Sequence, residues 1–206
     1  MKIGIIGAGH IGGTLAGRFR ELGYDVIVAN SRGPQTLGDL AARTGATPGT
    51  VAEAANADVV VVAIPLRAVP DLPAGVFDGR IVVDANNYYA QRDGQIAAID
   101  EGTTSSRWVA DHLAGAHVVK AFNNVYAGHL GAGGKPAGTP GRIALPAAGD
   151  DPGAKKTVLG LIDELGFDPV DGGPLDESWR QEPGSPVYGT DRDAAGVREG
   201  LADAVR

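Results

Sequence analysis

The sequence predicts an α/β fold with a doubly wound, mainly parallel sheet and a short C-terminal helical appendage. Short apolar runs alternate with helical patterns along the chain, and the connections between them are brief. The first apolar run, residues 2–6, leads through a glycine-rich turn into a helical pattern that ends at Gly23. This strand, turn and helix, followed by a second apolar run at residues 26–29, is the order of a Rossmann-type βαβ unit.

The glycine-rich turn reads Gly7-Ala8-Gly9-His10-Ile11-Gly12, a G-x-G-x-x-G motif in its required place between a strand and a helix. Gly7 permits the tight turn, Gly9 lets the backbone approach a pyrophosphate, and Gly12 lets the helix pack close to the sheet. The helix N-terminus would present free N–H groups to the phosphates. His10 is a candidate for contacting phosphate or substrate, or for contributing only its backbone N–H. The motif predicts a bound dinucleotide.

The end of the second strand indicates which dinucleotide binds. A site for NAD usually carries an Asp or Glu there, which accepts hydrogen bonds from the ribose 2′-hydroxyl. This chain instead has Asn30, Ser31 and Arg32. A hydroxyl and a guanidinium donate to a 2′-phosphate, which a carboxylate would repel. NADP(H) is therefore predicted over NAD(H).

The later elements follow in order. Helices are expected over residues 33–43, 51–55, 106–114 and 152–165 and from residue 193, with strands at 58–65, 80–84, 117–121, 142–148 and 167–175. Residues 90–105 read as a surface excursion, and the glycine-rich stretch 131–141 as a mobile loop. We expect a dinucleotide-binding domain over residues 1–176. Residues 177–206 would form an irregular tail with a terminal helix, packed on the body or on a partner subunit.

The strand ends define one candidate cleft, because ligands of open α/β sheets bind at the carboxyl ends of strands. The residues concerned are Gly7–Gly12, Asn30–Arg32, Ile64-Pro65, Asn86-Asn87 and Ala121–Asn123. The amides of Asn86 and Asn123 could bind a ribose, a carboxamide or a substrate carbonyl, or could simply cap turns. Lys120 points either into the cleft or into the opposite layer. His112, His117 and His129 lack metal-ligand spacing, so no metal site is expected.

Composition excludes several classes of partner. The net charge of −7 argues against nucleic acid and anionic membranes. The chain has no cysteine, which excludes disulfides and thiolate chemistry. No apolar run approaches the length of a membrane span and no signal peptide is recognised, so a cytoplasmic location is expected.

Candidate acid–base groups are sparse, and this has a consequence for the reaction. Reduction of a simple ketone or 2-oxo acid usually needs a proton donor beside the hydride path. Transfer between NADPH and a second delocalised cofactor needs mainly the apposition of two rings. The sequence therefore favours hydride exchange between cofactors, with no catalytic side chain assigned.

Several motifs together resemble the family of F420-dependent NADP oxidoreductases, over about residues 1–178. They are Gly7–Gly12, Asn30–Arg32, Ala63–Pro65, Val118–Asn123, Gly149–Asp151 and Gly166–Pro174. The reductase domain of the STEAP metalloreductases, which passes hydride from NADPH to a flavin, is similar through Lys120–Asn123.

The resemblance implies direct hydride transfer between NADP(H) and coenzyme F420 or a flavin-like acceptor, without an acid or base, in what is commonly a homodimer. Gly9–Gly12, Ile11 included, would hold the pyrophosphate, and Ser31-Arg32 the 2′-phosphate. The nicotinamide side would be lined by Ile64, Pro65, Asn86 and Ala121. The chain departs from the archaeal pattern at His10, at Asn86–Tyr89 and in the tail from Trp179.

Two alternatives stay open at this point. One is an NADPH-dependent reductase of a small imine or carbonyl metabolite that uses Lys120, Tyr88 or Tyr126 as its proton donor. The other is an NADP-binding protein without turnover.

Overall fold

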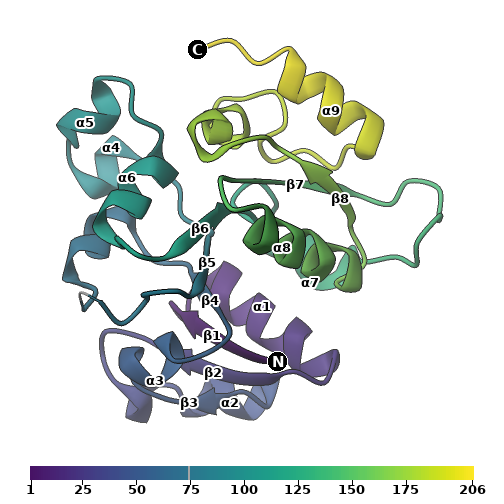
Figure 1. Cartoon of the computed structure of the whole chain (residues 1–206). Coiled ribbons are helices and arrows are strands. Elements are labelled where there is room, and N and C mark those ends of the chain that lie inside the picture. The colour runs from purple at the N-terminus through teal and green to yellow at the C-terminus, as the bar shows by residue number, and fades with distance from the viewer. Residues whose placement is uncertain (74) are drawn as a thin grey trace.

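The computed structural model describes residues 1–73 and 75–206. Its centre is an eight-stranded sheet in the order β3-β2-β1-β4-β5-β6-β7-β8 (Figure 1). The strands are β1 (Lys2–Ile6), β2 (Asp25–Ala29), β3 (Thr47–Pro48), β4 (Val59–Val62), β5 (Ile81–Asp84), β6 (His117–Lys120), β7 (Ala144–Gly149) and β8 (Asp168–Asp171). Each neighbouring pair in this described sheet is parallel except β6 and β7. The predicted doubly wound, mainly parallel α/β fold is confirmed.

Helices cover both faces of this sheet. They are α1 (His10–Glu21), α2 (Gly38–Thr44), α3 (Val51–Ala55), α4 (Ala90–Asp93), α5 (Ala97–Asp100), α6 (Ser105–His112), α7 (Ala127–Ala132), α8 (Pro152–Glu164) and α9 (Ala194–Ala202), with the 3-10 helices η1 (Pro34–Thr36), η2 (Leu66–Asp71) and η3 (Leu175–Gln181). One apolar layer joins α1, α2, α7 and α8 to the sheet, and the other joins α3, η2 and α6.

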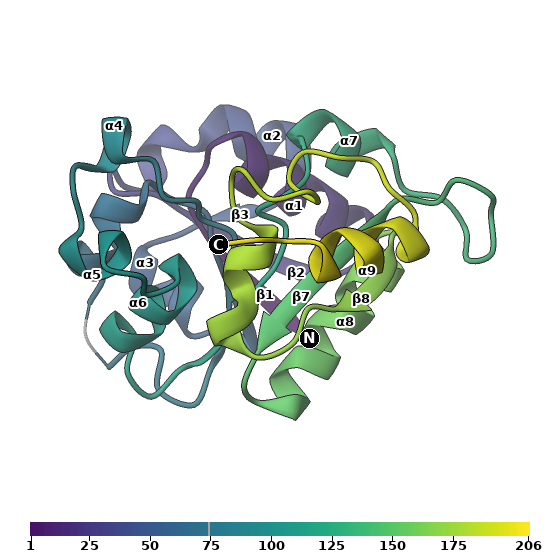
Figure 2. The same ribbon diagram turned by 90° about the horizontal axis from the view of Figure 1, so that it is seen from above.

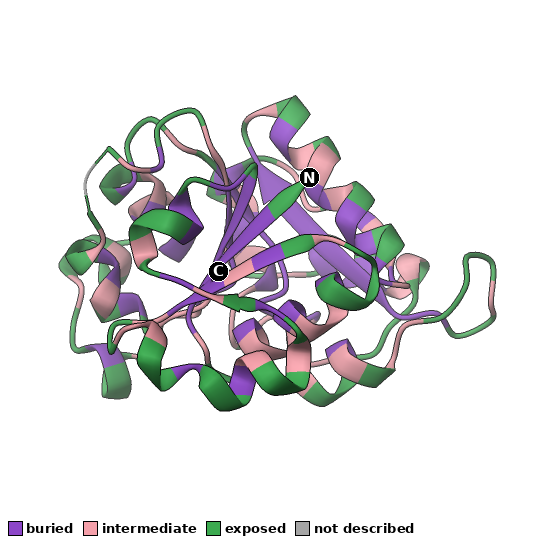
Figure 3. Cartoon of the chain, turned by 90° about the horizontal axis from the view of Figure 1, so that it is seen from below, coloured by how far each residue is buried: buried purple, intermediate pink, exposed green. Residues whose placement is uncertain are grey.

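The strand sequences explain the two layers. Successive side chains of a strand point to opposite faces. In β4, Val59 and Val61 lie in the layer with α1, whereas Val60 and Val62 lie in the layer with α3. All four valines are 0–1% exposed, as a parallel strand covered on both faces requires. Figure 3 shows the buried strands enclosed by helices whose outer faces are exposed.

The observed helices differ from the expected ones in three places. The helix predicted over residues 33–43 is divided into η1 and α2, with Leu37 between them. The excursion at residues 90–105 contains α4 and α5, each of four residues. One helical turn is too short to show a periodic apolar pattern. The helix α7 was also missed, because its sequence AGHLGA contains two residues of very low helix propensity.

The C-terminal residues pack on the β7–β8 end of the sheet. Val197 and Leu201 of α9 form a small apolar cluster with Val170, Val187 and Ala144. The helix begins at Asp193, whose side chain accepts a hydrogen bond from the Gly196 N–H. Figure 2 shows α9 and η3 lying over this part of the sheet. Within residues 1–73 and 75–206, no helix is both long and apolar enough to span a bilayer.

Candidate functional site

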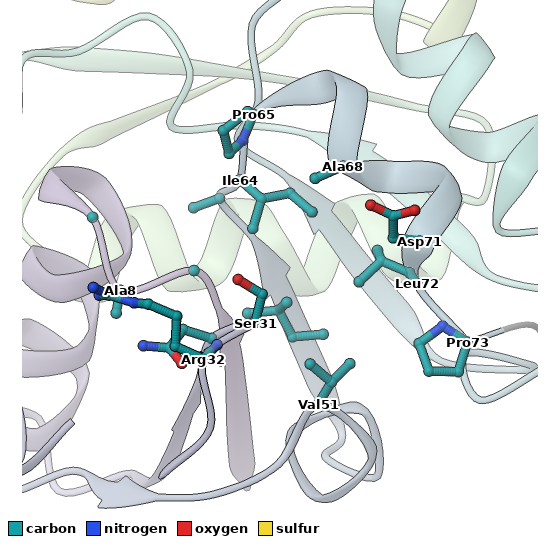
Figure 4. A pocket seen from close by; sticks show the side chains of 15 residues that line it. Ala8, Ser31, Arg32, Val51, Ile64, Pro65, Ala68, Asp71, Leu72 and Pro73 are labelled. Atoms are coloured by element: carbon teal, nitrogen blue, oxygen red, sulfur yellow. Dashed lines mark hydrogen bonds between the residues drawn. The ribbon is translucent and has the colours of Figure 1, made fainter. Parts of the chain in front are cut away.

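A cavity of about 580 Å³ lies at the carboxyl ends of β1, β2 and β4. The strand order reverses between β1 and β4, which is where open α/β sheets bind their ligands. Its walls bring together much of the predicted site, namely Gly7, Ala8, Gly9, Asn30, Ser31, Arg32, Ile64 and Pro65. Figure 4 shows Ser31 and Arg32 on one side of this cavity and Asp71 and Leu72 of the η2 region opposite them.

The first and last glycines of the motif are required by the fold itself. Gly7 has a φ of +117°, which side-chain-bearing residues rarely adopt, and a Cβ there would overlap the carbonyl oxygen of Ala63. A Cβ on Gly12 would overlap the carbonyl oxygen of Gly7. Gly12 is buried and lets α1 lie directly against the turn, so its contribution to cofactor binding would be indirect.

Gly9 has no such reason to be a glycine. Its φ of −77° is open to any residue, and a Cβ there would meet no protein atom within 4 Å. Gly9 is the N-cap of α1, where no side chain accepts the terminal N–H groups and no acidic residue stands in the first turn. An anion bound against this loop would occupy the space that a side chain on Gly9 would fill, and it would accept hydrogen bonds from the uncapped N–H groups. The residues present therefore fit a dinucleotide pyrophosphate.

The side chain of Asn30 stabilises the turn that follows β2. Its Oδ1 accepts a hydrogen bond of 2.9 Å from the Arg32 N–H, and its Nδ2 donates to Thr36 at 2.9 Å. The side chains of Ser31 and Arg32 are exposed, line the cavity, and make no hydrogen bond or ion pair within the described residues. Asn30 thus shapes the turn, and the hydroxyl and guanidinium are free to bind a phosphate.

We predict that Arg32→Ala weakens NADPH binding by ~1–3 kcal/mol, the range for a lost hydrogen bond to a charged group, and leaves NADH binding nearly unchanged. Titration of the nicotinamide fluorescence measures both affinities. Arg198→Ala, on the exposed face of α9, is the matched control and should change neither. Equal losses for the two cofactors would contradict the assignment of Arg32 to the 2′-phosphate.

A second cavity, of about 290 Å³, adjoins the first along Gly9 and Ala63–Pro65. It is also lined by His10, Ile11, Ala85, Asn86, Asn87, Tyr89 and Arg92. The Oδ1 of Asn86 accepts a hydrogen bond of 2.8 Å from the Ile64 N–H. Its Nδ2 is buried and has no partner within the described part of the chain. A buried amide N–H₂ of this kind fits a carbonyl acceptor such as the carboxamide of nicotinamide.

Lys120 is fully buried on the far side of Asn86 and does not line this cavity. Its Nζ donates to the Asn86 carbonyl oxygen at 2.6 Å and to Ser105 at 3.1 Å, and it lies 3.3 Å from Asp84. Asp84 is fully buried too, and accepts from the Asn86 N–H at 3.0 Å. The pair therefore holds the backbone of Asn86, and the side chain of Lys120 points into the opposite layer.

The structure separates the other candidates. Ala121 is fully buried and lines neither cavity. The Tyr88 hydroxyl bonds to Gly94 and Asp100 on the α5 side, and Tyr126 lies on the surface at 60% exposure. Within the described residues, no group of three His, Asp or Glu side chains could hold a metal ion.

The sequence interpretation did not single out several lining residues. Val51, Leu72 and Pro73 line the larger cavity, and Tyr89 and Arg92 the smaller one. Tyr89 and Arg92 follow the end of β5, so the rule that ligands bind at strand ends was the available signal for them. Leu72 and Pro73 follow η2, where no sequence motif marked them.

The residues from β1 to the end of β5 match a known family. The model for coenzyme F420-dependent NADP oxidoreductases matches residues 2–88. The solved structure of the uncharacterised protein SMa0349 from Sinorhizobium meliloti is 36% identical, with 93% of this chain and 95% of that chain covered and a TM-score of 0.82. The chain belongs to the family of F420-dependent NADP oxidoreductases.

Two further relatives agree with this membership. A structure from Arthrobacter sp. FB24, named for F420-dependent NADP reductase activity, is 25% identical over 87% of each chain, with a TM-score of 0.74. Rat metalloreductase STEAP3 is 28% identical over 84% of this chain and 34% of its own length. The chain spans less than half the length of the curated relatives it matches. The family whose model matches residues 2–88 is one of NADP oxidoreductases.

Proposed function

We propose that the chain transfers a hydride between NADP(H) and coenzyme F420 or a flavin-like acceptor. Gly9–Ile11 would hold the pyrophosphate and Ser31-Arg32 the 2′-phosphate. Gly7, Gly12 and Asn30 would shape those loops. Ile64, Pro65 and Asn86 would border the nicotinamide, whereas the buried Ala121 lines neither cavity. When bound, NADPH supplies a hydride from its nicotinamide ring.

One observation carries this proposal. Lys120, Tyr88 and Tyr126, the proton donors that the sequence offered for a small carbonyl or imine, are absent from the lining of the second cavity, beside Asn86, where the nicotinamide would lie. Part of its wall is an apolar ledge of Ala63, Ile64 and Pro65, and the polar side chains of the wall are His10, Asn86, Asn87, Tyr89 and Arg92. An apolar ledge beside bound nicotinamide favours the stacking of a second conjugated ring, which is the main requirement for transfer between two rings. The Arthrobacter relative supports the same acceptor class by its name.

The chain's own residues would do three things in this reaction. Gly9 and the α1 N-terminus bind the phosphates, Asn86 orients the carboxamide through its free Nδ2, and the Ala63–Pro65 ledge keeps water from one face of the rings. Asp84 and Lys120 keep Asn86 in place from behind.

The test is to mix the protein with NADPH and F420, FMN, FAD, a small imine or ketone, or no acceptor, and to follow the nicotinamide absorbance. Oxidation with F420, and slower or no oxidation with the others, is the expected result. Turnover only with small imines or ketones would support the alternative reductase. Tight binding of NADPH without turnover of any acceptor would support a non-catalytic NADP-binding protein.

We also propose that the protein acts as a homodimer in the cytoplasm, where cells maintain their NADP(H) pool. The dimer rests on the family pattern. Light scattering of the purified chain across a range of concentrations measures its mass, and a monomer at every concentration would overturn this proposal.

A further inference from the structure

The second cavity, beside Asn86, is bordered by a pair of tyrosines that the proposed function does not use. Tyr89, which lines the cavity, and Tyr188, from the segment between η3 and α9, have their hydroxyl oxygens 2.6 Å apart. The two residues are 99 positions apart in the sequence. One hydroxyl must donate to the other, so the direction of that hydrogen bond decides which phenol keeps a free proton.

Neighbouring amides present a hydrogen-bond donor to one member of this pair. A backbone carbonyl can only accept, so the Asn123 carbonyl oxygen requires the Nδ2 of Asn87 as its donor, at 2.8 Å. The same Nδ2 lies 3.4 Å from the Tyr188 hydroxyl oxygen. On the other side, the Asn87 Oδ1 accepts from the Asn123 Nδ2 at 3.0 Å. The side-chain amide of Asn87 is therefore fixed with its donor toward Tyr188.

The Asn123 amide is fixed in the same manner. Its Nδ2 also donates to the carbonyl oxygen of Gln181 at 2.8 Å, and its Oδ1 accepts from the Gln181 Nε2 at 3.0 Å. Asn123 follows Phe122, which has a left-handed φ of +61°. A non-glycine residue in this region is strained, and the surrounding structure must offset that strain. The turn thus brings Asn123 between the strand ends and the tail.

Either phenol can donate within this pair, and the Tyr188 oxygen also faces the Asn87 donor. When Tyr188 donates to Tyr89, the Tyr89 hydroxyl keeps a proton for which the described residues offer no acceptor, and Tyr89 is the phenol that lines the cavity. The Arg92 guanidinium lies over the ring of Tyr89, 5.0 Å from the ring centroid. The backbone N–H of Tyr89 donates a hydrogen bond to the Asp93 carboxylate at 3.1 Å.

The Tyr188 phenol keeps its proton at neutral pH. Burial, followed by the hydrogen bond with Tyr89, raises the pKa of Tyr188 well above its usual value. Burial also acts to raise the pKa of Asp93, but the hydrogen bonds from Arg92 and from the Tyr89 N–H outweigh it, and the pKa is lowered. Asp93 is thus a carboxylate that keeps Arg92 and the Tyr89 backbone in place.

We infer that the Tyr89 hydroxyl donates a hydrogen bond to the hydride acceptor, and that Tyr188 is the positioning residue that aims it. The acceptor would then carry a carbonyl oxygen or ring nitrogen conjugated with the carbon that receives the hydride. As the nicotinamide is oxidised, that carbon gains the hydride and its π electrons move onto the conjugated oxygen or nitrogen. Tyr89 stabilises this charge, and solvent supplies the balancing proton. This inference rests on the proposed function and adds a donor to it.

The test is a double-mutant cycle with Tyr89→Phe, Tyr188→Phe and the pair, using F420 as the probe acceptor and NADPH as the donor. Tyr89→Phe should lower kcat about ten- to a hundredfold while the Kd of NADPH stays unchanged. Tyr188→Phe should lower kcat by a smaller factor. The double variant should lower kcat by no more than Tyr89→Phe alone, because Tyr188 acts through Tyr89. Tyr126→Phe, which alters a surface phenol without a hydrogen bond among the described residues, is the control.

Two kinds of failure can be told apart. Wild-type turnover of F420 with unchanged rates in all three variants would overturn the inference and leave the proposed function standing. No turnover by the wild type would overturn the proposed function. Binding of oxidised F420 to the NADP⁺ complex, measured by quenching of F420 fluorescence, would then decide the inference. Weaker binding by Tyr89→Phe supports it, and equal binding or none contradicts it.

Discussion

Lys120→Met is expected to lower the free energy of unfolding by ~3–5 kcal/mol. The substitution removes one member of a fully buried ion pair and leaves Asp84 as a carboxylate inside the protein. The Ser106 hydroxyl and the Asn86 N–H still donate to Asp84, at 2.5 and 3.0 Å, but neither supplies a compensating charge. Urea unfolding followed by circular dichroism measures the change.

The matched double variant Lys120→Met/Asp84→Asn separates the lost charge from the lost packing. Asn keeps the shape of Asp and removes the uncompensated charge, so the double variant should be more stable than Lys120→Met alone. Lys2→Met, which disturbs an exposed contact of 4.0 Å with Asp25, should change stability by less than about 1 kcal/mol. The single variant Asp84→Asn completes the cycle. A loss in the double variant equal to the sum of the losses of Lys120→Met and Asp84→Asn would contradict the coupling of Lys120 and Asp84.

Gly7→Ala and Gly9→Ala are expected to fail in different ways, although the two residues stand in one motif. Gly7→Ala should cost about 2–6 kcal/mol of stability, because the alanine must adopt a φ of +117° and meets the Ala63 carbonyl. Gly9→Ala should cost less than about 1 kcal/mol, the range for a changed N-cap, since its Cβ meets no protein atom. Thermal unfolding without cofactor compares them.

The same Gly9→Ala variant should bind NADPH more weakly by ~1–3 kcal/mol, because a methyl group would stand where the pyrophosphate is proposed to lie. Binding is measured by nicotinamide fluorescence on protein shown to be folded. The space above Gly9 would have no role in the cofactor site if Gly9→Ala kept wild-type affinity.

The sequence was sufficient to predict the sheet and most of the residues that line the larger cavity. The strands β1, β4 and β5 are continuous apolar runs, and the glycine motif lies directly after one of them, so their carboxyl ends could be placed together. Because Asn30–Arg32 and Ile64-Pro65 each follow a strand, they were placed in the same cleft.

The acceptor side could not be predicted in this way. The direction in which Lys120 points depends on which helix covers its face of the sheet, and that is a tertiary property. The contact between Tyr89 and Tyr188 joins a one-turn helix to an irregular segment, neither of which has a periodic pattern. Tyr89 was noted only as part of a departure from the family pattern, and its partner only as an aromatic residue of the tail.

The position of Tyr188 has a consequence for how such proteins diversify. The phosphate loops and the apolar ledge come from residues before β5, whereas the phenol that orients Tyr89 comes from a segment packed on the opposite end of the sheet. Substitutions between η3 and α9 could therefore exchange one acceptor for another while the affinity for the nucleotide stays constant. In this chain, the residues that bind the nucleotide and the residues that select the acceptor would then be free to change independently of each other.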